Sequence, residues 1–188
     1  MNRYFLLFFI FILAFSNCKL RVSTKPAEEI IEQIREEFAP DRRVARWRIH
    51  TSPRGQTVIL KGETNLPEAK KALLNKLREA GIDYEDNIDI LPHGDLDGMD
   101  YGVVRLSVCN IRSNIKHSAE LSTQAVMGTP LKVLKTYEDK PDWYLVQTPD
   151  GYLGCLDPDG FQMMNEETFN NWQSSEKIFI TAPQTFAR

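Results

Sequence analysis

The sequence predicts an α+β fold in which a small αββαβ module precedes an all-β barrel. Two observations lead to this prediction. Apolar residues between positions 26 and 92 follow first helical spacing, then strand alternation, then helical spacing again, whereas positions 101–165 show only short alternating runs separated by turn residues. The hydrophobic fraction of 42% is ordinary for a globular protein, so both segments can form a core.

The first 18 residues are predicted to be a signal peptide whose last residue, Cys18, is lipidated. Arg3 provides a basic start, and residues 4–15 form an apolar run that is shorter than the roughly 20 residues of a membrane-spanning helix. The polar break before Cys18 resembles the lipobox of bacterial lipoproteins. Phe15 and Asn17 depart from the usual lipobox residues, so simple secretion and an uncleaved anchor remain alternatives. The expected location is the cell envelope, with the chain lipid-anchored on the periplasmic side of the outer membrane.

Residues 26–92 are predicted to form the αββαβ module. Pro26 opens the first helix, and two alternating segments around a turn at residues 52–55 form a strand pair. Asn65 is expected to cap the second helix, which Gly81 ends, and a last strand follows. The expected apolar stripes are Ala27, Ile30, Ile31, Ile34 and Phe38 in the first helix and Leu66, Ala69, Leu73 and Leu77 in the second. This order of elements resembles the BON-type module of envelope proteins.

Residues 93–100, with the sequence HGDLDGMD, are predicted to be a solvated linker. Their acidic spacing also suggests a calcium loop, but such a loop needs a later bidentate glutamate and a helix on each side. Neither is evident in the sequence, so no metal and no cofactor is predicted.

Residues 101–165 are predicted to form a small barrel of five short strands, because a two-layer sandwich normally needs more strands. The expected strands are YGVVRLSVCNIRS, TPLKVLKTY, DWYLVQT, YLGCL and FQMM. Pro149, Asp150 and Gly151 form a tight hairpin turn between two central strands, and Gly151 supplies the positive φ angle that this turn requires. Residues 166–188 are expected to form a C-terminal helix and an extension.

Four segments resemble a bacterial SH3-like domain, namely NIRS, SAELSTQAVMGTPLKVL, DWYLVQTPDGYLG and NEETFNNWQSSEKIF. The resemblance covers residues 101–180. It is most specific to the first SH3-like domain of NlpC-type, papain-like peptidases. These enzymes cleave γ-D-glutamyl-diamino-acid bonds in cell-wall peptides. In those peptidases, acidic and tyrosine side chains of this domain line the substrate site and bind the free amine of the stem peptide. The resemblance therefore implies Glu120 and Tyr152 as ligand-binding residues, although Glu120 equally suits an ordinary loop carboxylate.

Aromatic side chains of the barrel add Trp143 as a third ligand-binding candidate. Flat rings beside a groove bury area at little entropic cost. Alternation places Trp143 and Tyr144 on opposite faces of their strand, so at most one of these two faces a ligand. Both residues also suit the barrel core.

This chain alone is predicted not to be an enzyme. The catalytic domain of the resembling peptidases carries an Asp-Cys-Ser-Gly motif that this sequence lacks, and the chain is compatible with being the N-terminal part of such a hydrolase. Alternation with Ile111 points Cys109 into the core, while Cys155 is expected near a surface groove. No spacing brings a histidine to either thiol, as a papain-like nucleophile requires. The two thiols are predicted to be unpaired.

The charge pattern gives no indication of a nucleic-acid partner. The net charge of −3 provides no overall attraction to nucleic acid or anionic lipid. Arginines around Trp47 form a candidate nucleic-acid stripe, but on an alternating strand they also form a solvated face, which is favoured. These arginines are Arg42, Arg43, Arg46, Arg48 and Arg54.

The predicted function is that of an exported lipoprotein whose SH3-like domain is the targeting or substrate-recognition part of a peptidoglycan (cell-wall) peptidase system. The expected partners are a peptidoglycan stem peptide or a cell-wall hydrolase, with membrane attachment through the lipid. The alternative is a non-enzymatic envelope protein whose barrel binds a protein partner. A third possibility is a membrane-tethered scaffold without a ligand.

Overall fold

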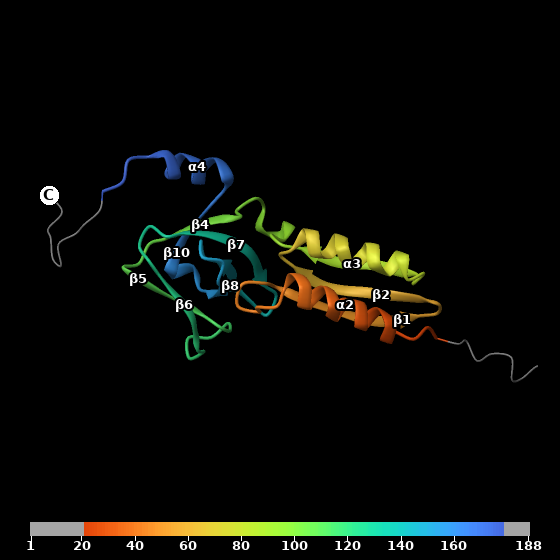
Figure 1. The fold of residues 1–188 in the computed structure, drawn as a ribbon. Helices are drawn as coiled ribbons and strands as arrows, with labels where there is room; N and C mark the ends of the chain where they lie inside the picture. The colour runs from red at the N-terminus through yellow and green to blue at the C-terminus, as the bar shows by residue number, and fades with distance from the viewer. Residues whose placement is uncertain (1–20, 179–188) are drawn as a thin grey trace, which may run out of the picture. The chain divides into compact units, whose positions relative to one another are not determined.

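A computed structural model describes residues 21–178, and the chain divides into two compact units (Figure 1). Of the described residues, the first unit contains 21–42 and 46–90, and the second contains 43–45 and 91–178. The fold is α+β, as predicted. The predicted signal peptide, Cys18 and the last part of the C-terminal extension lie outside the described residues. Within residues 21–178, no helix has the length and apolar character needed to cross a membrane.

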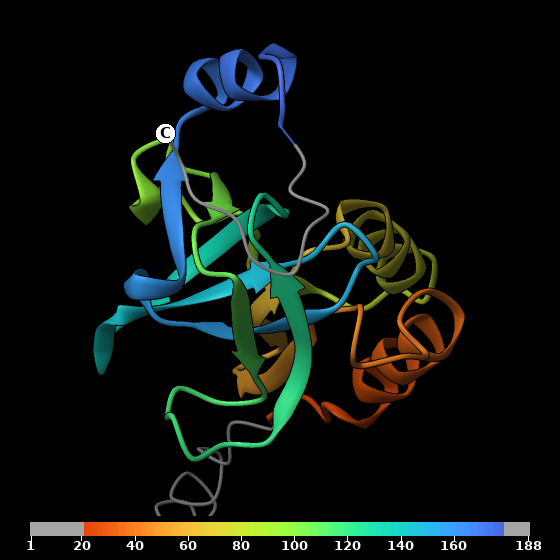
Figure 2. The same cartoon turned by 90° about the vertical axis from the view of Figure 1, so that its left-hand side faces the viewer.

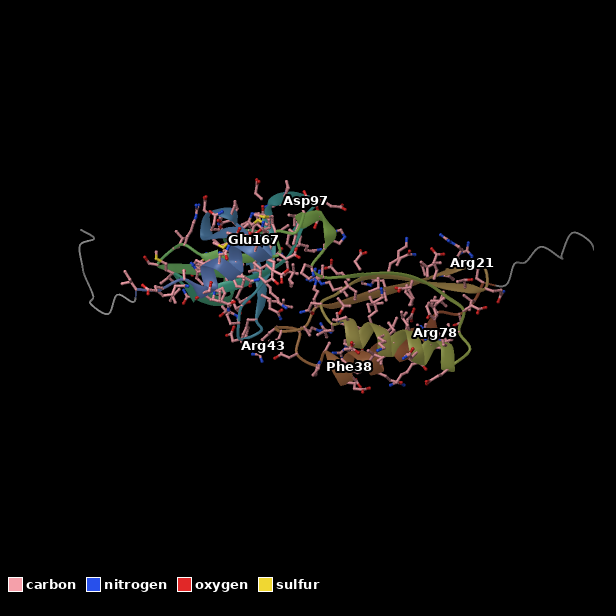
Figure 3. All side chains as sticks on the ribbon, turned by 90° about the horizontal axis from the view of Figure 1, so that it is seen from above. Arg21, Phe38, Arg43, Arg78, Asp97 and Glu167 are labelled. Carbon is pink, nitrogen blue, oxygen red and sulfur yellow. The ribbon has the colours of Figure 1, made fainter. Side chains whose placement is uncertain are left out.

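The first unit has the predicted αββαβ order. Its elements are α2 (Lys25–Phe38), β1 (Trp47–Arg54), β2 (Thr57–Thr64), α3 (Pro67–Glu79) and β3 (Tyr84–Ile90). The strand order is β1-β2-β3, with β1 antiparallel to β2. β3 runs parallel to β2 because α3 forms the crossover between them. Figure 3 shows α2 and α3 on the same face of this sheet.

The core of the first unit is formed by the two helices and the helix-facing side of the sheet. Its buried members are Ala27, Ile31, Ile34, Val58, Leu60, Ala69, Leu73, Leu77 and Ile88. Both predicted helical stripes are therefore confirmed in their main members. Phe38 is an exception, because it is the last residue of α2 and 38% of its surface is exposed.

The predicted cap of the second helix is wrong. α3 begins at Pro67, and the preceding residue, Leu66, makes no side-chain cap. Asn65 instead uses its side-chain oxygen to accept a hydrogen bond from the backbone N–H of Arg46, at 2.8 Å. Proline suits the first helical position because its missing N–H would have no partner there. The start of the helix is thus fixed by Pro67, and Asn65 fixes the entry to β1.

The predicted arginine face is partly wrong as well. Arg46 donates to Glu63 at 2.6 Å, and both side chains are mostly buried within the sheet, at 13% and 17% exposure. Arg54, by contrast, forms an exposed pair with Glu85 on β3. Arg46, just before β1, and Arg54, at the end of β1, therefore pair with carboxylates of β2 and β3.

The second unit is an antiparallel sheet consistent with an SH3-like barrel, but it has seven strands and not five. They are β4 (Tyr101–Val104), β5 (Val108–Arg112), β6 (Leu121–Val126), β7 (Pro130–Tyr137), β8 (Lys140–Gln147), β9 (Leu153–Leu156) and β10 (Phe161–Met164), in the order β10-β4-β7-β8-β9-β5-β6. The predicted first strand is split, because Arg105 leaves the ladder to donate its backbone N–H to Gly160. β6 was not predicted, because two of its exposed residues, Leu121 and Val126, are apolar and the strand therefore lacks a clear alternation.

Figure 2 shows the strands of the second unit curving around a common core. Its buried residues include Val104, Cys109, Ile111, Leu131, Val133, Val146, Leu156 and Phe161. Leu96 also belongs to this core, and its segment forms the short 3-10 helix η1 (Gly94–Leu96). The stretch 93–100 is therefore packed against the barrel, in contrast to the expected solvated linker. The backbone N–H of His93 donates to Leu134 at 2.8 Å, which fixes its start.

The helix expected after the barrel is α4 (Glu166–Ser174). Asn165 caps it by accepting from the backbone N–H of Thr168 at 2.9 Å. Phe169 is the buried residue of α4, and its ring stacks on Tyr101 of β4 with 4.6 Å between ring centres. This contact fixes α4 beside the barrel (Figure 2).

Candidate functional site

The turn between β8 and β9 has the predicted geometry. Gly151 has a φ angle of +90°, which favours glycine, and its N–H donates to the carbonyl of Thr148 at 2.9 Å. Thr148 in turn donates its own N–H to Tyr152 at 3.0 Å. The Thr148 hydroxyl contacts the Asp150 carboxylate and the Tyr152 carbonyl, so the turn is internally bonded. These hydrogen bonds hold the turn in one conformation, so a ligand can pack against it.

Residues 43–45 lie against this hairpin as part of the second unit. The backbone N–H of Leu153 donates to Arg43 at 2.7 Å, and the Gln147 amide donates to Val44 at 3.3 Å and to Gly151 at 2.9 Å. The Arg43 guanidinium lies 5.7 Å from the centre of the Tyr152 ring. Tyr152, a predicted ligand-binding residue, is half-buried and has a cation over its ring.

A cavity of about 360 Å³ lies beside the hairpin, within the second unit. Residues of β4, β7, β8, the turn and α4 line it, namely Tyr101, Pro130, Leu131, Lys132, Gln147, Thr148, Pro149, Gly151 and Phe169. Its lining is mostly apolar, and among residues 21–178 Lys132 is the only charged side chain that lines it. This composition, apolar walls with few polar groups, is typical of small-ligand sites.

Trp143, the aromatic candidate, is not available as a ligand wall. Only 7% of its surface is exposed, and its ring centre lies 5.1 Å from that of His117. Tyr144 packs on the core, where it meets Phe161 edge to face. His117, by contrast, has a side chain that is 78% exposed and lies 3.8 Å from Asp157. Trp143 therefore supports the loop that carries His117.

Glu120 lies at the end of the loop between β5 and β6 and is exposed. Its carbonyl accepts from the backbone N–H of Ser113 at 2.8 Å, which closes the loop. Within the described residues, no hydrogen bond or ion pair joins Glu120 to Tyr152 or Trp143. The three predicted ligand-binding residues thus lie in three different environments.

The two cysteines are buried and form no disulfide with each other, which confirms the prediction for these thiols. Cys109 lies in the core as expected, and burial raises the pKa of its thiol, with a smaller contribution from the charge of Asp157. Cys155 is only 4% exposed and its sulfur contacts the Tyr137 hydroxyl at 3.3 Å, so its predicted position near a surface groove is wrong. Burial disfavours the reactive thiolate at Cys109. Among residues 21–178, no group of three or more potential ligands is placed to hold a metal ion.

Most residues that line the cavity were not predicted from the sequence. Tyr101, Lys132 and Gln147 come from three strands and become neighbours only through strand register. The helical segment that supplies Phe169 was recognised, but its docking position was not. One signal was present, since the hairpin turn that forms one wall was predicted from Pro149 to Gly151.

Comparison with known families gives one match on this unit. Residues 111–160 match the family model described as bacterial dipeptidyl-peptidase SH3 domain. The matched range runs from β5 through the hairpin to the second 3-10 turn, η2 (Pro158–Gly160). No curated protein matches the chain. The second unit thus carries an SH3 domain of the kind found in bacterial peptidoglycan peptidases, which indicates a cell-wall peptidase context, and no catalytic domain is found in the chain.

Proposed function

We propose that the chain is an exported lipoprotein whose SH3 domain recognises wall peptides on behalf of a peptidoglycan peptidase. The match of residues 111–160 to the peptidase SH3 family is the observation that carries this proposal. The cavity beside the hairpin supports it, because the cavity has a size and composition suited to a short peptide. In this proposal the chain itself performs no catalysis, and the bond cleavage belongs to a catalytic domain or partner.

The direct test is retention of the purified chain on insoluble peptidoglycan. We expect the chain to sediment with peptidoglycan. A soluble stem peptide should compete for the chain and return it to the supernatant. A chain that stays in the supernatant would contradict the wall-binding role.

The alternative role, binding of a protein partner, is favoured by a separate observation. Apolar side chains are exposed on and next to β5 and β6, at 44% for Leu106, 54% for Val108 and 61% for both Val126 and Met127. An exposed apolar group of this kind commonly marks an interaction surface. Peptidoglycan retention separates the two roles, because a protein-binding barrel has no affinity for the purified wall.

Glu120 and Tyr152 are proposed to bind the free amine of the stem peptide. Glu120→Gln should weaken binding by about 1.5–3 kcal/mol, because it removes a charge-assisted contact, and Tyr152→Phe by about 0.5–1.5 kcal/mol. Arg43 already lies over the Tyr152 ring, so the phenol oxygen is the group expected to accept from the ligand. The measurement is calorimetry with a stem peptide that has a free amino terminus and with the same peptide acetylated.

Two controls make this amine test specific. Glu138→Gln removes an exposed carboxylate at the β7–β8 turn and should leave both affinities unchanged. Melting temperature should barely change in any of these variants, because none creates a cavity or an unpaired buried charge. Equal affinity for the free and the acetylated peptide would rule out amine recognition by Glu120 and Tyr152.

Cys18 is proposed to carry the membrane anchor on the periplasmic side of the outer membrane. Cys18→Ser should leave the chain either in the soluble envelope fraction or as an unprocessed precursor, because stable attachment needs more than one acyl chain and serine accepts none by this route. Fractionation and the mass of the processed chain measure the result. A Cys18→Ser chain that is processed and membrane-bound like the parent would show that the lipoprotein assignment is wrong.

A further inference from the structure

We propose that the cavity beside the hairpin binds a peptide C-terminus. In this arrangement Lys132 and Tyr101 hold the terminal carboxylate, and Gln147 accepts from the N–H of the last peptide bond. The inference extends the proposed function, on which it rests for the source of the peptide. It concerns a different end of the ligand from the one assigned to Glu120 and Tyr152.

Strand register places the three polar residues in one row. Tyr101 is the register partner of Lys132, and Lys132 is the register partner of Gln147. Side chains of directly opposite residues lie on the same face, with β-carbons about 4.5–5.5 Å apart. The neighbours of Lys132 along β7, Leu131 and Val133, are buried in the core, so Lys132 lies on the outer face. The row Tyr101–Lys132–Gln147 therefore forms the floor of the cavity.

The hydrogen-bonding capacity left over on this floor matches a peptide C-terminus. The Gln147 amide nitrogen is committed to the carbonyls of Val44 and Gly151, which leaves its oxygen as an acceptor. Within residues 21–178, neither the Lys132 ammonium nor the Tyr101 hydroxyl has a hydrogen-bond partner. The floor thus offers two donors, one of them charged, beside one acceptor. A terminal carboxylate needs the donors, and the adjacent amide N–H needs the acceptor.

Charge selects the same ligand. Within the described part of the chain, Lys132 is the only charged side chain that lines the cavity, so a group with a single negative charge is favoured and a free amino terminus is repelled. The Thr148 hydroxyl is already engaged with Asp150 and the Tyr152 carbonyl, which leaves no third strong donor for a phosphate. A carboxylate is therefore the better match among small anions.

The walls of the cavity are preorganised and apolar. The Phe169 ring stacks on Tyr101 with 4.6 Å between ring centres, and the rings of Pro130 and Pro149 also line the cavity. These groups lose little conformational freedom when a ligand binds. A volume of about 360 Å³ accommodates one or two residues with small side chains. The predicted ligand is therefore a peptide that ends in a small apolar residue with a free carboxylate.

The test uses the 188-residue chain and the probe acetyl-alanyl-alanine, in its all-L and all-D forms, together with the C-terminal amide of each. We expect one of the free acids to bind and its amide to bind at least about tenfold more weakly, since the charge-assisted contact is lost. Lys132→Gln should weaken binding of the acid by a similar factor. Tyr101→Phe keeps the ring that stacks on Phe169 and should weaken binding by about three- to tenfold.

Lys116→Gln is the matched control, because it removes another exposed lysine, which lies in the β5–β6 loop and outside the cavity. Affinity should be unchanged in this variant. Equal affinity for acid and amide, or equal losses in Lys132→Gln and Lys116→Gln, would overturn the inference. If the chain is retained on peptidoglycan but binds neither free-acid peptide, only the cavity assignment is overturned. Binding of the acid that depends on Lys132, without retention on peptidoglycan, supports the cavity assignment and removes the wall as the source of the peptide.

Discussion

Gly62→Ala should destabilise the first unit by about 3 kcal/mol or more, because it combines backbone strain with a direct clash. Gly62 lies inside β2 with a φ angle of +135°, where other residues are strained. A β-carbon at this position would lie 1.8 Å from the carbonyl oxygen of Arg48. That oxygen belongs to β1, which pairs with β2 along its whole length, so it cannot withdraw without breaking the ladder.

Gly55→Ala is the matched control, in the turn that joins β1 to β2. Gly55 also has a positive φ angle, +62°, but an added β-carbon would have no atom within 4 Å. The expected loss is about 1–2 kcal/mol, from the left-handed backbone alone. Chemical denaturation measures both variants, and hydrogen exchange should locate the loss in β1, β2 and β3. Similar losses at Gly55 and Gly62 would show that the contact with Arg48 has no energetic effect.

The first unit was largely predictable from the sequence because its signals are local. Apolar spacing defined both helices and alternation defined the strand pair, and neither requires knowledge of distant residues. The error at Asn65 has a local cause as well. Asn65 and Pro67 are both typical of a helix start, and the structure uses the proline for the helix and the asparagine for β1. Two valid signals therefore competed within three residues.

The candidate site was less predictable because it depends on register and long-range packing. Lys132 lies between Tyr101 and Gln147 only once β4, β7 and β8 are paired, and the curvature of the barrel leaves no trace in any single segment. Burial of Trp143 under the loop that carries His117 could not be inferred from alternation alone. Arg43 belongs in sequence to the first half of the chain, yet it contacts Tyr152 in the second unit. Turn chemistry, by contrast, was local, and the hairpin was predicted correctly.

Ile111→Ala should destabilise the second unit by about 2–5 kcal/mol, the range observed when a large buried aliphatic side chain is truncated. Ile111 is fully buried in the core of the SH3 domain, where β5 pairs with β6. Val108→Ala on the same strand is the control. Because Val108 is 54% exposed, its truncation should change stability by only about 0.5 kcal/mol or less. Chemical denaturation measures the stability of both variants, and hydrogen exchange should locate the loss in β5 and β9.

Gly154→Ala tests whether Ile111 is packed as tightly as the structure indicates. A β-carbon on Gly154 would lie 2.4 Å from Cγ2 of Ile111 and 3.0 Å from the carbonyl oxygen of Arg112, so the single variant should lose about 1–3 kcal/mol through overpacking. Ile111→Ala removes that Cγ2 atom. In the double variant the new methyl group occupies part of the space vacated, and the combined loss should be smaller than the sum of the single losses by about 0.5–3 kcal/mol. Ile111→Val keeps Cγ2 and should give no such relief with Gly154→Ala. Strict additivity in the Ile111→Ala pair would mean that Gly154 and Ile111 are not in contact, and that β9, which leads out of the hairpin, is seated differently on β5.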